Sequence, residues 1–156
     1  MGIVRLTVHQ AKDLDTTKAM TGDLNPFVKL YTASSPTHPL YVTRKVKHTN
    51  SPVWEDSTEF LCTDKASSVI IAKVIDDRDF LKDPVVGFMS IRLTDILGAR
   101  QSGKDWWPLS RARSGKIRLT AEWKPLDMAG SLHGAEQYMP PIGVVRLWLQ
   151  RARDVK

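Results

Sequence analysis

Short segments of alternating apolar and polar residues, separated by turn residues, constrain this chain most strongly. In the first of them Val4, Leu6 and Val8 fall on one face, as a half-buried β-strand requires. The alternating segments are residues 3–8, 27–31, 41–47, 57–62, 69–75, 87–93, 105–109 and 116–123. Strands of this length and spacing predict an all-β fold, an eight-stranded antiparallel β-sandwich.

One further segment, residues 94–99, reads as a short helix that Thr94 would cap and Gly98 would end. Such a short helix is not the crossover of a parallel sheet, so the predicted fold class is unchanged. In the strand over 105–109, Trp106 and Trp107 are neighbours, and the alternation predicts that one of them faces the core.

The chain repeats its own beginning near its end. Residues 143–154 align without a gap to residues 2–13, with six identical positions. Glycines and prolines punctuate residues 127–142, which is typical of a linker. We therefore expect one domain over 1–126, then the linker, then the truncated first strand of a following repeat over 143–156. A strand with unpaired backbone groups should pair with its own domain or with another chain.

Charge and composition narrow the class of partner. The formal net charge of +6 favours anionic partners. No basic helix is visible and aromatic residues make up only 8%, which argues against nucleic acid.

The single cysteine, Cys62, allows no disulfide within the chain and indicates a reducing compartment. No zinc-ligand spacing and no converging nucleophile and base are present, so we expect neither a zinc site nor an enzyme. We also expect no transmembrane segment and no signal peptide.

Several motifs, in order along the chain, resemble the C2 domain family. They are the opening strand at 2–14, the Asn-Pro-Phe-Val-Lys segment at 25–29, the Thr-Asn-Ser-Pro-Val-Trp-Glu turn at 49–55, the loop from Asp76 to Gly87, and Trp107-Pro108-Leu109. The resemblance covers residues 2 to about 126. It implies a lipid-binding β-sandwich, and because the first strand is the Gly2 strand, it implies that the last strand closes the sandwich in the type II arrangement.

Within that family, the chain resembles the C2 repeats of tricalbins and extended synaptotagmins. The residues that carry this likeness are Asp76-Asp77-Arg78-Asp79, Asp83-Pro84, Asp105-Trp106 and Glu122-Trp123-Lys124-Pro125. The resemblance implies a peripheral module of a multi-C2 membrane-tethering, lipid-transfer-associated protein, on the cytoplasmic side of membranes at contacts between endoplasmic reticulum and plasma membrane. Its implied partners are anionic phospholipid and neighbouring C2 repeats. The alternative is a protein-interaction module that does not bind lipid.

A C2 calcium site needs about six to eight oxygen ligands per ion, mostly carboxylates from two loops. The resemblance places first-loop ligands at Ala19 and Asn25, and third-loop ligands at Asp76, Arg78 and Pro84, so several carboxylates are missing. The remaining calcium candidates are Asp23, Asn25, Asp76, Asp77, Asp79 and Asp83. We expect weak calcium binding or none, and no required cofactor.

A stretch without acidic residues between Tyr41 and Val53 provides the predicted phospholipid-binding residues. They are Arg44, Lys45, Lys47 and His48. If 41–47 is an extended strand, Lys45 and Lys47 share the polar face opposite Val42 and Val46. A second basic segment, residues 111–118, reads as a soluble hairpin around Ser114-Gly115.

Overall fold

The computed structural model describes residues 1–17, 23–78 and 83–126. Contacts divide the chain into the units Met1–Lys124 and Pro125–Lys156, and the sandwich is the first of them. Its elements are β1 (Gly2–Lys12), β2 (Pro26–Thr32), β3 (Tyr41–Val42), β4 (Val53–Cys62), β5 (Val69–Asp76), β6 (Val85–Arg92), α1 (Leu93–Ser102), β7 (Trp106–Pro108) and β8 (Lys116–Pro125). The predicted linker over 127–142 and the predicted repeat strand over 143–156 lie outside the described residues.

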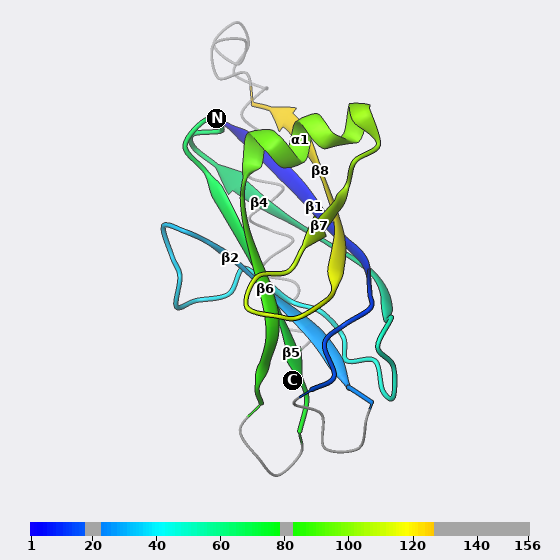
Figure 1. Cartoon of the computed structure of the whole chain (residues 1–156). Helices are drawn as coiled ribbons and strands as arrows, with labels where there is room; N and C mark the ends of the chain where they lie inside the picture. The colour runs from blue at the N-terminus through cyan, green and yellow to red at the C-terminus, as the bar shows by residue number, and fades with distance from the viewer. Residues whose placement is uncertain (18–22, 79–82, 127–156) are drawn as a thin grey trace, which may run out of the picture. The chain divides into compact units, whose positions relative to one another are not determined.

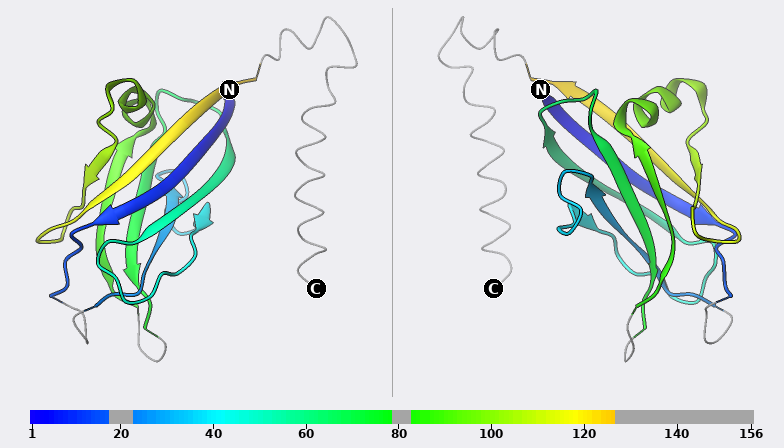
Figure 2. Two further views of the ribbon diagram at one scale, coloured as in Figure 1. Left: turned by 90° about the vertical axis from the view of Figure 1, so that its right-hand side faces the viewer. Right: turned by 60° about the vertical axis from the view of Figure 1, so that its left-hand side comes forward.

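The strands form two antiparallel sheets of four, in the orders β4-β1-β8-β7 and β3-β2-β5-β6 (Figures 1 and 2). The predicted all-β sandwich is therefore confirmed. The last strand, β8, is hydrogen-bonded beside the first, β1, which is the closure that the type II arrangement implies. No helix in the described part of the chain is long and apolar enough to cross a membrane.

The core lies between the sheets and follows the alternation of the strands. Val4, Leu6 and Val8 of β1 and Val28 and Leu30 of β2 all point into it and are fully buried. Burial of side chains of this size contributes roughly 1.5 to 3 kcal/mol each to the stability of the fold. The packing of these inward-facing residues therefore holds the two sheets together.

The two tryptophans of β7 divide as the alternation predicts. Trp107 packs against the core, and its Nε1–H donates to the Leu119 carbonyl at 3.1 Å. Trp106 carries the Lys12 ammonium over its ring, 4.2 Å from the centroid. Trp107 is thus the core residue of the pair.

Helix α1 is longer than predicted, and both predicted ends are wrong. It runs from Leu93 to Ser102; its N-cap is Arg92, which makes no side-chain capping bond. Gly98 stays helical because buried residues on either side of it, Ile96 and Ala99, anchor the helix to the core. The left-handed residue that ends the helix is Gly103, with φ of 72°.

The prediction of a strand over 41–47 is also wrong beyond Val42. Thr43 points inward and is 3% exposed, whereas Val42 is exposed, so the predicted facing is reversed at these two residues. Val46 packs against the core and Lys45 and Lys47 are exposed, as predicted. The Thr43 hydroxyl accepts a hydrogen bond from the Val28 amide at 2.9 Å, taking the place of a backbone carbonyl in the ladder. That substitution ends regular pairing, and residues 43–47 continue beside β2 without forming a strand.

Candidate functional site

The described parts of the connections β1–β2, β3–β4 and β5–β6 meet at the end of the sandwich opposite the N-terminus and α1 (Figure 1). Backbone hydrogen bonds tie them together: the Thr49 amide donates to the Leu24 carbonyl, and the Asp77 amide to the Asn25 carbonyl. The polar side chains gathered here form a group that we call the loop end. Its members are Asn25, Lys45, Asp76, Asp77, Arg78 and Asp83.

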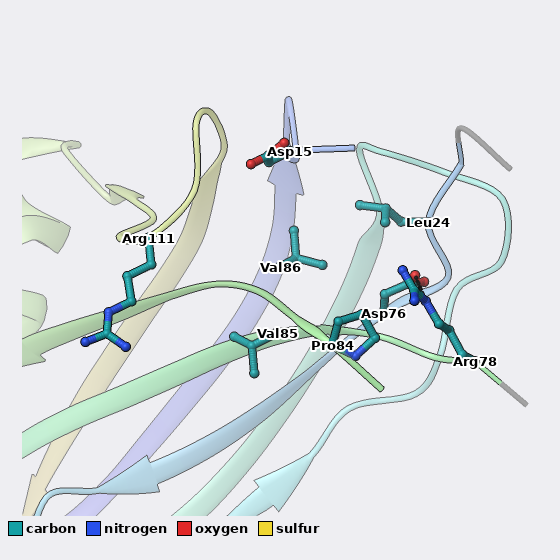
Figure 3. A pocket seen from close by; sticks show the side chains of 8 residues that line it. All are labelled: Asp15, Leu24, Asp76, Arg78, Pro84, Val85, Val86 and Arg111. Carbon is teal, nitrogen blue, oxygen red and sulfur yellow. Dashed lines mark hydrogen bonds and ion pairs between the residues drawn. The ribbon is translucent and has the colours of Figure 1, made fainter. Parts of the chain in front are cut away.

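Asp76 is the buried centre of the loop end, with a side chain only 4% exposed. One of its oxygens accepts a hydrogen bond from the Asn25 backbone amide at 2.8 Å. The other pairs with Arg78 Nε at 3.2 Å, and Figure 3 shows the Asp76 and Arg78 side chains together. Asp76 and Arg78 line a small cavity of about 10 Å³ with Asp15 and Leu24. That volume is room for roughly one water molecule, so the cavity cannot admit a lipid headgroup.

The other two described carboxylates of the third loop are engaged as well. Asp77 Oδ1 lies 3.2 Å from Lys45 Nζ, and Asp83 Oδ1 accepts the Arg78 amide at 2.8 Å. The side-chain oxygen of Asn25 accepts a hydrogen bond from the His48 backbone amide at 3.0 Å. At least one side-chain oxygen of each of Asn25, Asp76, Asp77 and Asp83 is therefore partnered by one of the protein's own donors.

As they are placed, the described residues of the loop end do not form the oxygen shell of a calcium ion. No group of three or more acidic, histidine or cysteine side chains with metal-binding geometry occurs among residues 1–17, 23–78 and 83–126. Of the sequence candidates, Asn25, Asp76, Asp77 and Asp83 lie together at the loop end, and Asp23 is exposed at the start of the second described range. Asp79 lies outside the described residues.

A second feature near the loop end is the β7–β8 connection, residues 109–115, which bridges the two sheets. Phe88 of β6 and Ser110 exchange backbone hydrogen bonds, at 3.3 and 2.7 Å. Asp15 accepts the Arg113 amide at 3.0 Å. The backbone amides of Arg113 and Thr17 lower the pKa of Asp15 from 3.8 to about 2, so Asp15 remains a carboxylate at neutral pH.

The outer surface of the sheet β3-β2-β5-β6 is basic. The strand register places Lys29 of β2 directly opposite Lys73 of β5, and Lys73 opposite Phe88 of β6. The one acidic residue in β2, β5 and β6 is Asp76, at the end of β5 inside the loop end. Two like charges therefore face each other with no carboxylate between them in these strands.

Four cations of this surface lie over aromatic rings, whereas Arg92 at the end of β6 pairs with Asp95. Lys29 and Lys45 lie 6.0 and 5.4 Å from the Phe27 centroid, and Lys73 lies 4.9 Å from that of Tyr31. Arg111, carried in by the β7–β8 connection, lies 5.7 Å from the Phe88 centroid. We call this surface the cationic face. It consists of Lys29, Lys45, Lys73 and Arg111 with the rings of Phe27, Tyr31 and Phe88.

Part of the cationic face is hollowed into a groove of about 570 Å³. Ile71, Lys73, Phe88, Ser90 and Arg111 are among its lining residues. The volume falls within the range of roughly 300 to 1,000 Å³ that is usual for small-molecule sites. A groove lined by apolar side chains and by the two cations Lys73 and Arg111 suits an anionic group attached to apolar chains.

The four basic residues predicted to bind phospholipid have different surroundings in the structure. Lys45 joins the cationic face but is also paired with Asp77, and Arg44 is directed to the β4 edge, where it donates to the Trp54 carbonyl at 2.9 Å. Lys47 and His48 are exposed, and His48 has a left-handed backbone with φ of 56°. They do not form one row, because residues 43–47 are not a strand.

Sequence reasoning missed Lys29 and Lys73, and it assigned Arg111 to a soluble hairpin and not to the lipid-binding residues. The pattern Phe27-x-Lys29-x-Tyr31 does show, at i and i+2, that a lysine and two rings share one face of β2. That Lys73 lies opposite Lys29 follows only from the pairing of β2 with β5.

A family model of the C2 domain matches residues 2–109. With the sandwich and its strand order, this match shows that the chain belongs to the C2 domain family.

Its relatives include tricalbins and synaptotagmins. Tricalbin-3 of Saccharomyces cerevisiae is 29% identical over 147 residues, which are 94% of this chain and 9% of that protein. Synaptotagmin-5 of Arabidopsis thaliana is 29% identical over 122 residues, 78% of this chain and 21% of that protein. The chain therefore spans only a small part of these relatives.

The fold is similar to that of a solved C2 domain of a plant extended synaptotagmin 1. The TM-score is 0.68 at 21% identity, and the match covers 81% of this chain and 96% of that one. A structure that holds two C2 domains of extended synaptotagmin 2 matches with a TM-score of 0.63 at 22% identity, over 78% of this chain and 40% of that one. At these identities the likeness shows the fold alone.

Proposed function

We infer that the chain is a non-catalytic, peripheral membrane-binding module whose cationic face binds anionic phospholipid. The observation that carries this proposal is the direct opposition of Lys29 and Lys73 across the β2–β5 ladder. Like charges placed directly opposite destabilise a sheet, and a bound phosphate between them turns that repulsion into attraction.

The strength of such binding follows from the number of cations. Each Lys or Arg near an anionic leaflet contributes about 1 kcal/mol. Lys29, Lys73 and Arg111 would thus supply about 3 kcal/mol, with Lys45 contributing less because Asp77 already neutralises it. One module of this kind binds weakly and in a salt-dependent manner, and neighbouring C2 repeats in the same protein would add avidity.

The likeness to tricalbins and synaptotagmins supports a wider setting for this activity. In this proposal the module belongs to a multi-C2 tethering protein, faces the cytoplasm, and acts where endoplasmic reticulum and plasma membrane come into contact. Its membrane binding is calcium-independent or weakly calcium-dependent, because the cationic face supplies the positive charge that a bound calcium ion would otherwise provide.

Sedimentation with phosphatidylserine-containing vesicles, with and without calcium, tests the proposal. Lys29→Gln with Lys73→Gln removes two cations, or about 2 kcal/mol, and should weaken binding roughly thirtyfold. Arg5→Gln with Lys124→Gln, an exposed pair on the opposite sheet, is the matched control and should retain binding.

Equal loss in both double variants would mean that binding depends on net charge and would refute the assignment to this face. If the unaltered chain does not sediment with anionic vesicles at low salt, direct lipid binding is wrong, and the protein-interaction module is then the function to pursue.

A further inference from the structure

We propose that Arg78 and Lys45 are resident counter-ions of the loop end, so that the protein's own cations take the electrostatic role that calcium has in a C2 site. This inference concerns the loop end, which shares Lys45 with the cationic face, and it does not require that the cationic face binds lipid. It starts from the poor fit of the described residues to a calcium shell.

The first step is the burial of Asp76. A carboxylate that is only 4% exposed needs charge compensation, because desolvation of an unpaired anion is costly. The Asn25 backbone amide donates to one oxygen of Asp76 at 2.8 Å. The other oxygen still needs a partner, and Arg78 Nε lies 3.2 Å from it. Arg78 is itself 20% exposed, so the pair is held in a partly dry site where its attraction is little screened.

The second step is that Arg78 joins both ends of the third loop. Its side chain pairs with Asp76, where β5 ends, while its backbone amide donates to Asp83, just before β6 begins. The Asp76 amide also donates to the Pro84 carbonyl at 3.0 Å. A calcium ion would close such a loop by drawing its carboxylates together, and here a guanidinium and an amide of one residue make the corresponding connections.

The third step is the second cation. Lys45 Nζ reaches Asp77 at 3.2 Å from the segment after β3, and the same ammonium lies over the Phe27 ring. Lys45 therefore links the third loop to a different connection of the sandwich. The three carboxylates Asp76, Asp77 and Asp83 thus receive two cationic side chains and two backbone amides, those of Asn25 and Arg78, all from within the chain.

Among the described carboxylates, a divalent cation could bind both oxygens of the buried Asp76 only by displacing Arg78. The loop end therefore keeps one electrostatic state whatever the calcium concentration. Removal of the guanidinium would leave the buried carboxylate uncompensated, and a calcium ion could then stabilise the fold by taking its place.

Thermal unfolding in EDTA and in about 1 mM calcium, well above the range of sensor sites, tests this assignment. The unaltered chain should show the same Tm in both. Arg78→Ala should lower the Tm in EDTA by more than about 5 °C and recover part of the loss in calcium. Arg92→Ala is the matched control: its Nε also lies 3.2 Å from a carboxylate oxygen, of Asp95, but both side chains are exposed. It should change neither Tm by more than about 2 °C.

Arg78→Gln, which retains bulk and a hydrogen-bond donor, extends the test to a milder change. Its Tm should rise with calcium, and Arg78→Lys, which keeps the charge, should not respond. The proposal is overturned by a calcium-dependent Tm in the unaltered chain, by a loss in Arg78→Ala no larger than in Arg92→Ala, or by the absence of calcium rescue in both neutral variants. Vesicle binding of Arg78→Gln in EDTA, expected to stay within about twofold of the unaltered chain, reports separately on the cationic face.

Discussion

The Thr43 side-chain hydroxyl takes the place of a backbone carbonyl as hydrogen-bond acceptor beside β2. Substitution of Thr43 by valine should therefore measure how much this hydrogen bond contributes to the free energy of unfolding. The Thr43 hydroxyl accepts the Val28 amide at 2.9 Å and donates to the Arg44 carbonyl at 3.0 Å. Valine fills nearly the same volume but offers neither bond, so the fully buried Val28 amide loses its acceptor. An orphaned buried donor costs roughly 1 to 3 kcal/mol, and we expect a loss of about 2 kcal/mol.

For a domain of this size that loss corresponds to a decrease in Tm of about 5 to 10 °C. Calorimetry or circular dichroism measures the decrease, and the slope of unfolding free energy against denaturant should not change, because the exposed surface is the same. Thr43→Ser keeps the hydroxyl and loses one methyl group, so its cost should be about 0.8 kcal/mol. If Thr43→Val is as stable as the unaltered chain, or more stable than Thr43→Ser, the hydroxyl is not part of the ladder in the way described.

Two further predictions follow from the site. The pKa of Asp15 is lowered from 3.8 to about 2, so its contribution to stability is present above pH 3.8 and is lost as the pH falls towards 2. The variant Asp15→Asn should therefore lose less Tm than the unaltered chain over that interval. If the two chains lose Tm equally, the hydrogen bonds from Arg113 and Thr17 to Asp15 are contradicted. The double variant Lys45→Gln with Lys47→Gln should weaken binding to phosphatidylserine vesicles by about fivefold. This loss is smaller than that expected for the Lys29 and Lys73 substitutions, because Asp77 already neutralises Lys45. A larger loss would make the segment after β3 the principal lipid contact.

The loop end was partly accessible from the sequence. Asp76 and Arg78 stand at i and i+2, which places both on one side of an extended segment, and their opposite charges indicate a pair. The partner of Asp77 was not accessible, because Lys45 reaches it from a separate connection of the sandwich. Nor does the sequence show that Asp83 accepts a backbone amide rather than a side chain.

The sequence by itself determined the class of fold and most strand positions, because period-two alternation between turn residues depends only on which side chains leave water. Strand β5, predicted over 69–75 and found at Val69–Asp76, is an example. Tertiary structure decided which strands lie side by side, and with that the identity of the cationic face. Lys29 and Lys73 are distant in the chain and meet only through the β2–β5 register. It also decided the direction of Thr43, since the inward turn of that residue depends on an unpaired amide of β2 that no local pattern around residue 43 reveals.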